Sequence, residues 1–104
     1  MTVGYDSRAD TVTVTMDAFG LTPGHHAAHI HSGSCYGQGP VVYTLRDFVA
    51  DSDGNIINQT RVVGGVTHYP ASGWYFNLHQ GNARDIQHNG KPAIGFRPLL
   101  CANI

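Results

Sequence analysis

The sequence of 104 residues contains no glutamate and only one lysine, so two of the residues that are most frequent on helix surfaces are nearly absent. All seven acidic side chains are Asp, and five of the six basic ones are Arg. Long helices are therefore not expected. Thirteen Gly and five Pro, with frequent Val, Thr and aromatic residues, instead predict short strands joined by turns. The length predicts a single domain that spans residues 1–104, and the composition predicts that this domain is all-β.

Long apolar runs and an excess of positive charge are also missing. No apolar run approaches the roughly 20 residues that a membrane-spanning helix needs, so no membrane span is expected. The net charge of -1 and the scattered basic residues exclude an electrostatic surface for nucleic acid or an anionic membrane. The sequence starts without the basic and apolar segments of a secretory leader, so we expect either a cytosolic protein or one whose leader is absent.

The two cysteines, Cys35 and Cys101, are too far apart in sequence for a CxxC metal or redox motif. A disulfide between them would close a long loop, and the chain-entropy model values such a loop at roughly 4 kcal/mol. The alternative is two unrelated buried thiols. The disulfide is the preferred interpretation, and it predicts an extracytoplasmic protein that is secreted, periplasmic or on the cell surface.

Alternation of apolar and polar residues predicts about seven strands, a number typical of a sandwich or a small barrel. Residues 51–55 (Asp-Ser-Asp-Gly-Asn) are typical of a hairpin turn, with one strand on either side. The predicted strands are 11–16, 27–31, 41–45, 46–50, 56–63, 74–79 and 93–99.

Seven His residues are the compositional outlier, and four of them lie within residues 25–31. On a strand, His29 and His31 share one face while the residues between them point to the core. His79 ends another predicted strand, on the face opposite to its apolar residues. Three imidazoles without thiolate or carboxylate suit Cu, Zn, Ni or Fe, although surface or packed histidines remain the alternative. The lack of Glu excludes an HExxH hydrolase and a cupin site.

Several segments then resemble a known family, in the same order along the chain. Residues 20–31 (GLTPGHHAAHIH) resemble the GLTPGxHGFHxH segment that supplies two copper ligands in copper/zinc superoxide dismutases. They are equally similar to the GLTPGxxAAHIHxG stretch of the CHRD domain, whose following GPVV strand corresponds to residues 39–42. Residues 50–54 are similar to the family's ADxDG hairpin, residues 73–79 to the CHRD strand that ends in YxNxH, and residues 97–101 to its RLxC ending.

This resemblance covers residues 10–103 and implies an immunoglobulin-like Greek-key β-sandwich of seven or eight strands with one copper ion on its outer face. The residues that it assigns to the site are His29, His31 and His79 as copper ligands, His26 as a structural histidine that hydrogen-bonds the backbone, and Cys35 and Cys101 as a disulfide.

Two departures from the dismutase pattern bear on function. The 18 residues from Ser32 to Val49, where the dismutases have a bridging His and the zinc ligands, contain no His, so no zinc is expected. Arg97, the candidate for the catalytic Arg, lies four residues before Cys101 instead of three, and this offset turns a side chain to the other face of a strand unless a bulge restores it.

The remaining histidines have open roles. His68 precedes the His79 strand and is a candidate fourth ligand or hydrogen-bond donor to the site. His25 and His88 are interpreted as loop residues, or as weak extra ligands.

The sequence thus predicts an exported copper-binding domain, with copper-only dismutation of superoxide as its enzymatic hypothesis. The alternative is a non-enzymatic protein that stores, buffers or delivers copper and exchanges it with a copper donor or acceptor. The oligomeric state is left open.

Overall fold

The computed structural model describes residues 1–37, 39–81, 87–88, 91–92 and 98–104. Every regular element in this part of the chain is a strand, and no helix occurs there. The strands are β1 (Thr2–Asp6), β2 (Thr11–Ala18), β3 (Gly24–Ser32), β4 (Val41–Ala50), β5 (Ile56–Val63), β6 (Trp74–His79), β7 (Gln87–His88), β8 (Lys91–Pro92) and β9 (Pro98–Asn103).

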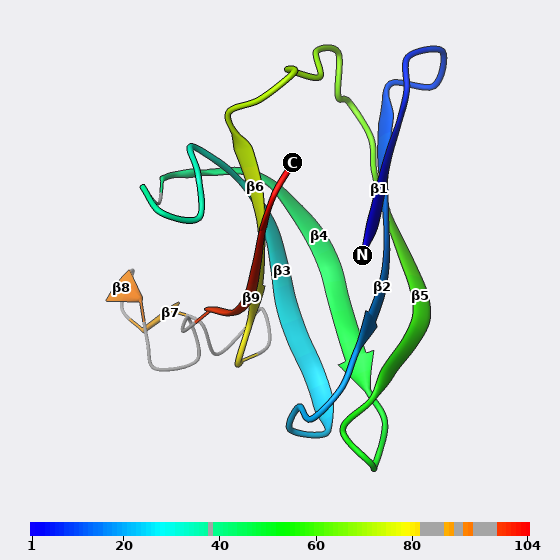
Figure 1. The fold of residues 1–104 in the computed structure, drawn as a ribbon, viewed down its shortest axis with the longest axis vertical. Helices are drawn as coiled ribbons and strands as arrows, with labels where there is room; N and C mark the ends of the chain where they lie inside the picture. The colour runs from blue at the N-terminus through cyan, green and yellow to red at the C-terminus, as the bar shows by residue number, and fades with distance from the viewer. Residues whose placement is uncertain (38, 82–86, 89–90, 93–97) are drawn as a thin grey trace.

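Two antiparallel sheets lie face to face and form a sandwich (Figure 1). One sheet has the strand order β1-β2-β5 and the other has the order β4-β3-β6-β9, while β7 and β8 pair with each other. The chain crosses between the two main sheets after β2, after β4 and after β5. The all-β Greek-key sandwich predicted from the sequence is confirmed. The described segments contain no helix with the length and hydropathy needed to cross a bilayer.

The core lies between the sheets and is built from alternate residues of each strand. On β2, residues 12, 14, 16 and 18 are buried, whereas the residues between them are at least partly exposed, as expected for a strand with one face in the core. The largest apolar side chains of this cluster are Phe48, Phe76, Ile30, Ile56 and Leu78. Phe48 and Phe76 meet edge to face, with their ring centroids 6.2 Å apart, and so join β4 to β6.

Strand β4 corrects one prediction, because residues 41–45 and 46–50 form one continuous strand and not two. Ala28 pairs with Leu45 and His26 pairs with Phe48, so three steps along β4 correspond to two along β3. This β-bulge allows both Leu45 and Phe48 to reach the core. The simple alternation of apolar residues is broken there, and the sequence therefore reads as two strands.

The predicted hairpin at residues 51–55 is also corrected. The turn itself forms, with Gly54 N donating to Asp51 O at 2.9 Å, but it connects β4 in one sheet to β5 in the other. Leu21 N donates to Gly54 O, and a Cβ on Gly54 would lie 2.2 Å from Leu21 O. The close approach of Leu21 and the pairing of β5 with β2 replace the expected pairing of β5 with β4.

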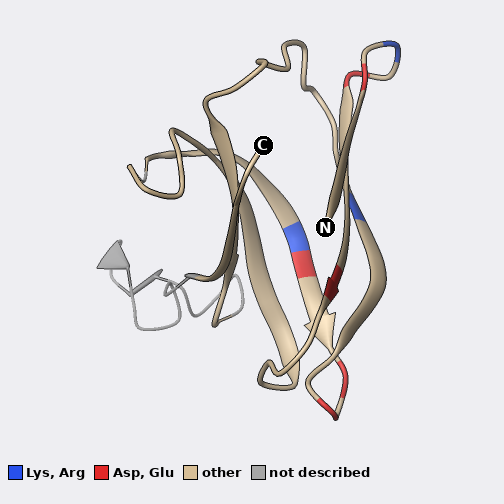
Figure 2. Cartoon of the chain, in the orientation of Figure 1, with Lys and Arg blue, Asp and Glu red and all other residues tan. Residues whose placement is uncertain are grey.

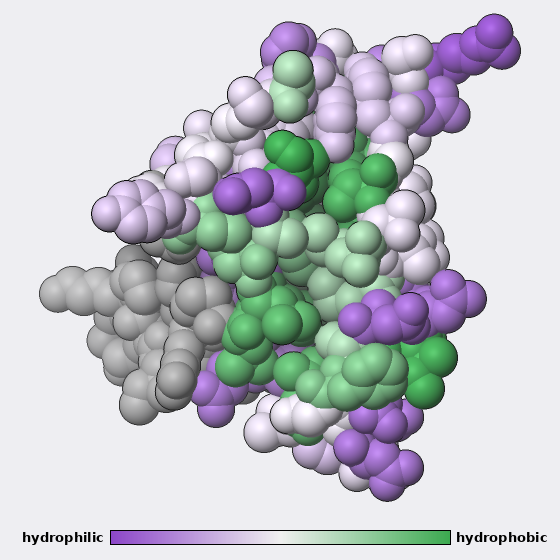
Figure 3. Space-filling view, in the orientation of Figure 1, coloured by the Kyte–Doolittle hydropathy of each residue, from purple (hydrophilic) through white to green (hydrophobic). Residues whose placement is uncertain are grey.

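At both ends of the chain the strands differ from the prediction. Strand β1 is present although the sequence did not predict it, and the last strand begins at Pro98. Residues 93–97 of the predicted last strand lie outside the described residues. Between β1 and β9 the sandwich is open, and apolar side chains are visible there (Figure 3). Met1, Met16 and Leu100 line this hollow of about 240 Å³.

Charged residues avoid the two central strands of the larger sheet. Neither β3 nor β6 contains Asp, Glu, Lys or Arg. In the described part of the chain, the charges lie on other strands and in turns, among them Arg46 and Asp47 on β4 and Arg61 on β5 (Figure 2). Any polar site on β3 and β6 is therefore built from uncharged side chains and histidines.

Candidate metal centre

Strand β3 delivers two imidazoles to one face of the larger sheet. Ala28 and Ile30 are fully buried in the core between the sheets, so His29 and His31 point to the other face. Both histidines are nevertheless buried, with 6% and 2% of their surfaces exposed. Their rings meet edge to face, with a centroid distance of 5.6 Å.

Strand β6 brings the third imidazole to the same face. In the antiparallel pairing of β3 with β6, His29 lies opposite Asn77 and His31 lies opposite Tyr75, and His79 follows two residues beyond Asn77. His29 Nδ1 and His79 Nε2 are 2.9 Å apart. One ligand atom from each of His29, His31 and His79 lies within 4.8 Å of those of the other two. The convergence of these three residues on one possible metal site was predicted from the sequence.

The orientation of His31 is set by a backbone carbonyl. Its Nδ1 lies 2.9 Å from Gly39 O and donates to it, because a carbonyl oxygen only accepts. Its Nε2 is buried and has no hydrogen-bond partner among the described residues. A neutral imidazole that donates from Nδ1 carries its lone pair on Nε2, which is the arrangement of a metal-ligating histidine. Nε2 is therefore ready to bind a cation.

Tyr75 holds the carbonyl that orients His31. Gly39 N donates to the Tyr75 hydroxyl oxygen at 2.6 Å, and this hydroxyl lies 3.2 Å from Gly39 O. The phenol ring also stacks on the His31 ring, at a centroid distance of 4.8 Å and an interplanar angle of 12°. A Cβ on Gly39 would lie only 1.9 Å from Ser32 O, so the close approach of the loop to β3 requires glycine.

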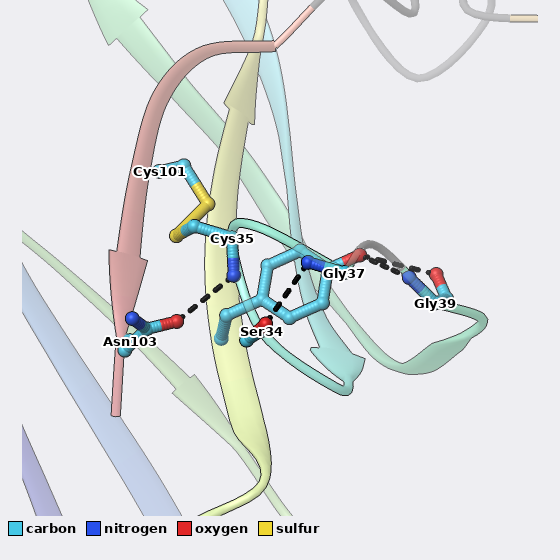
Figure 4. Close-up of a disulfide and its surroundings, with 7 residues drawn as sticks. Ser34, Cys35, Gly37, Gly39, Cys101 and Asn103 are labelled. Atoms are coloured by element: carbon cyan, nitrogen blue, oxygen red, sulfur yellow. Dashed lines mark hydrogen bonds between the residues drawn. A yellow bond between two sulfur atoms is a disulfide. The ribbon is translucent and has the colours of Figure 1, made fainter.

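The disulfide between Cys35 and Cys101 fastens the same loop to β9, so the predicted bond is confirmed (Figure 4). Cys35 N also donates to Asn103 Oδ1 at 2.9 Å, and Gly37 N donates to Ser34 Oγ at 3.0 Å. Residues from β9 thereby fix the loop that carries the Gly39 carbonyl. The disulfide thus supports the metal centre, although its sulfur atoms are not part of it.

His26 has a different environment from the other three buried histidines. Its Nδ1 lies 2.8 Å from His79 O and its Nε2 lies 2.7 Å from Thr22 O. Both ring nitrogens are thus directed at backbone oxygens, one at the end of β6 and one in the turn before β3. These contacts link the segments that carry the three clustered histidines, and they leave His26 out of that cluster.

The clustering changes the acid–base behaviour of His29. Its pKa is lowered from 6.5 to about 4, first because burial disfavours the imidazolium, and then because of the neighbouring His79 and His31. A ring that stays neutral in mildly acidic solution keeps its lone pair available, and metal ligation requires the neutral form. The fold therefore favours the ligand state of His29.

Among the other candidate residues from the sequence, His68 and His25 lie outside the cluster. His68 is exposed, and the neighbouring Tyr69 ring stacks on Tyr5 of β1 at 5.0 Å. His25 is exposed and its Nδ1 lies 3.6 Å from Asp47 Oδ2. Arg97 and the side chain of His88 lie outside the described residues.

Two features of the centre were not predicted from the sequence. One is the Gly39 carbonyl, because backbone acceptors leave no trace in residue type. The other is Asn77, which is 1% exposed and lies opposite His29. The alternation of β6 places Asn77 on the outward face between Tyr75 and His79. This pattern in the sequence could have identified Asn77 as a neighbour of the site.

Comparison of the sequence with known proteins and protein families identifies the family of this chain. No curated protein matches the chain at a significant level. The CHRD domain family matches residues 1–87, which include the β3 and β6 segments that carry the three histidines. Because this match covers most of the chain, the protein belongs to the CHRD domain family.

Proposed function

We propose that this CHRD domain is an exported copper-binding domain that holds one copper ion through His29, His31 and His79. The observation that carries the proposal is the buried group of three imidazoles in which His31 Nε2 has no partner among the described residues. A buried nitrogen acceptor without a partner costs free energy, and a bound cation removes that cost.

The donor set fits copper. Three imidazoles on strands without a single charged side chain offer only nitrogen from His, and imidazole suits copper among the transition metals. The similarity of residues 20–31 to the copper-ligand segment of the dismutases favours copper over zinc, nickel and iron. The disulfide supports export, because disulfides persist in oxidising compartments.

The enzymatic hypothesis is dismutation of superoxide. A bound copper ion would supply one-electron redox chemistry, by which two superoxide ions and two protons become dioxygen and hydrogen peroxide. The chain's own contribution is burial, which lowers the pKa of His29 and keeps its imidazole neutral, and the Gly39 carbonyl, which fixes the orientation of His31. Arg97 is proposed as the residue that attracts the superoxide anion.

Storage, buffering or delivery of copper is the second candidate. It is favoured by the burial of all three histidines, none of which is more than 6% exposed, since turnover requires that substrate reaches the metal. In this case the partner is a protein or small molecule that donates or accepts copper.

Copper loading of the oxidised protein separates these functions. We expect one copper ion per chain, and loss of this ion in His79→Ala but not in His25→Ala, the matched control on β3. In the same titration, His68→Ala tests whether this exposed residue, a candidate fourth ligand in the sequence but outside the cluster, contributes to binding. Superoxide decay is then measured on the loaded protein and on Arg97→Leu.

Decay faster than with free copper, slowed in Arg97→Leu and by added salt, would establish the enzyme. Stoichiometric copper without faster decay would establish a copper carrier. A protein that binds no copper would refute the proposal.

A further inference from the structure

Asn77 carries a buried oxygen that the described residues leave without a partner. The side chain lies on β6 and is 1% exposed, and its Oδ1 accepts no hydrogen bond from the described part of the chain. A buried amide oxygen in this state costs about 1–3 kcal/mol, and an apolar side chain of the same shape would avoid that cost. The position thus lowers stability unless the oxygen binds something other than the described residues.

The pairing of β3 with β6 places Asn77 among the three histidines. Directly opposite residues of an antiparallel pair have Cβ atoms about 4.5–5.5 Å apart, and Asn77 lies directly opposite His29. His79 follows it by two residues on the same face of β6, and His31 is its diagonal neighbour on β3. Asn77 therefore lies on the sheet surface from which the three imidazoles rise.

The distribution of unpartnered atoms points to the same place. In the described part of the chain, the buried side-chain nitrogen and oxygen atoms without a hydrogen-bond partner are His31 Nε2 and Asn77 Oδ1. Both belong to this face of the larger sheet, and both are acceptors. Two buried acceptors beside a cluster of histidines can both bind a cation through their lone pairs. The same lone pairs would repel an anion.

We propose that Asn77 Oδ1 is an additional donor to the metal ion, so that the site is formed by three nitrogens and one oxygen. The inference rests on the proposed copper binding by His29, His31 and His79, and it adds a ligand that the three-histidine site lacks. Carboxamide oxygen is a harder donor than imidazole or thioether, so it stabilises Cu(II) more than Cu(I). Asn77 thereby tunes the site toward the oxidised ion.

The test uses the full-length, disulfide-bonded chain. Affinities for Cu(II) and Cu(I) are measured by competition with chelators, and the ligand set is read from the electron paramagnetic resonance spectrum of the Cu(II) form. The variants are Asn77→Leu, which replaces the amide with two methyl groups in a similar branched shape but a larger volume, and Asn77→Asp, which keeps an oxygen there. Asn58→Asp, an exposed residue of the smaller sheet, controls for the added charge.

For Asn77→Leu we expect the Cu(II) affinity to fall about 10- to 100-fold, with a much smaller change for Cu(I) and a spectrum shifted toward nitrogen-only ligation. Without metal, its unfolding midpoint should rise, because the variant lacks the buried oxygen for which the described residues offer no partner. If Asn77 had a purely structural role, its replacement by Leu would instead lower the unfolding midpoint of the metal-free protein. Asn77→Asp should retain an oxygen-ligated spectrum and bind Cu(II) more tightly than the wild type, whereas Asn58→Asp should change neither.

An unchanged Cu(II) affinity and spectrum in Asn77→Leu would overturn the assignment of Asn77 while leaving the three-histidine site intact. If Asn77→Leu does not fold, Asn77→Asp decides, since an affinity no higher than wild type would also overturn it. Failure of the wild type to bind copper is a separate result, which refutes the proposed function itself.

Discussion

Lowering the pH should destabilise the metal-free protein through His29, whose pKa is lowered from 6.5 to about 4 by burial and by the neighbouring His79 and His31. Between these two values the unfolded chain binds a proton that the folded chain does not, so the free energy of unfolding rises with pH. This contribution is fully present above the unfolded pKa and is lost as the pH falls toward 4. Applied to one group, the linkage relation gives a loss of about 2 kcal/mol between about pH 7.5 and about pH 5.

The measurement is urea unfolding of the metal-free, disulfide-bonded protein at several pH values, followed by the fluorescence of Trp74, the single tryptophan. The chain has seven histidines, so the informative quantity is the difference in pH dependence between the wild type and His29→Gln, which cannot be protonated at this position. Midway between the folded and unfolded pKa values of His29, the unfolding free energy of the wild type should fall by about 1 kcal/mol more per pH unit than that of the variant.

Equal pH dependence in the two proteins would refute the reasoning, because it would mean that His29 titrates as it does in the unfolded chain. A steeper dependence in the variant would have the wrong sign and would also refute it.

Three further perturbations test the support of His31. Tyr75→Phe removes the hydroxyl that accepts from Gly39 N, so we expect a loss of about 1 kcal/mol in unfolding free energy and about tenfold weaker metal binding, measured by unfolding and by chelator competition. An affinity equal to wild type would contradict the role given to this hydroxyl. Gly39→Ala places a Cβ against Ser32 O, so we expect the loop to move and metal affinity to fall more than tenfold, with the far-ultraviolet circular dichroism of the sandwich unchanged. Retained affinity would show that the loop carbonyl is dispensable. Removal of the disulfide by Cys35→Ser should lower the unfolding free energy by roughly 4 kcal/mol, since the bond joins residues 66 positions apart. An unchanged denaturation midpoint in this variant would contradict the stabilising role of the bond.

The strands and the positions of the clustered histidines were accessible from the sequence because alternation assigns each residue to one face of its strand. On β3, the apolar Ala28 and Ile30 identify the core side, and His29 and His31 must then share the outer side. The same reasoning places His79 opposite to Phe76 and Leu78 on β6. Alternation alone gives no register between two strands, and the resemblance of residues 20–31 and 73–79 to one family was needed to bring the three residues together.

The remaining features depend on contacts that alternation does not encode. The bulge in β4 breaks the period, so that Leu45 and Phe48 both enter the core and one strand reads as two. The turn at residues 51–55 has the composition of a hairpin, but Leu21 binds Gly54 and β5 pairs with β2. The oxygen that accepts the hydrogen bond from His31 Nδ1 belongs to the backbone, eight residues further along the chain. A pattern of side chains does not predict such a contact.

The attachment of the loop to β9 sets an order of events for maturation. The carbonyl that orients His31 belongs to a loop held by Cys101 and Asn103, and both of these residues are on the last strand of the fold. A ribosome-bound chain that has not yet produced β9 therefore contains all three clustered histidines and Tyr75, but it lacks the disulfide and the Asn103 contact that hold the loop. In the proposed copper site, the support of His31 is therefore complete only after synthesis of β9 and oxidation of the cysteines.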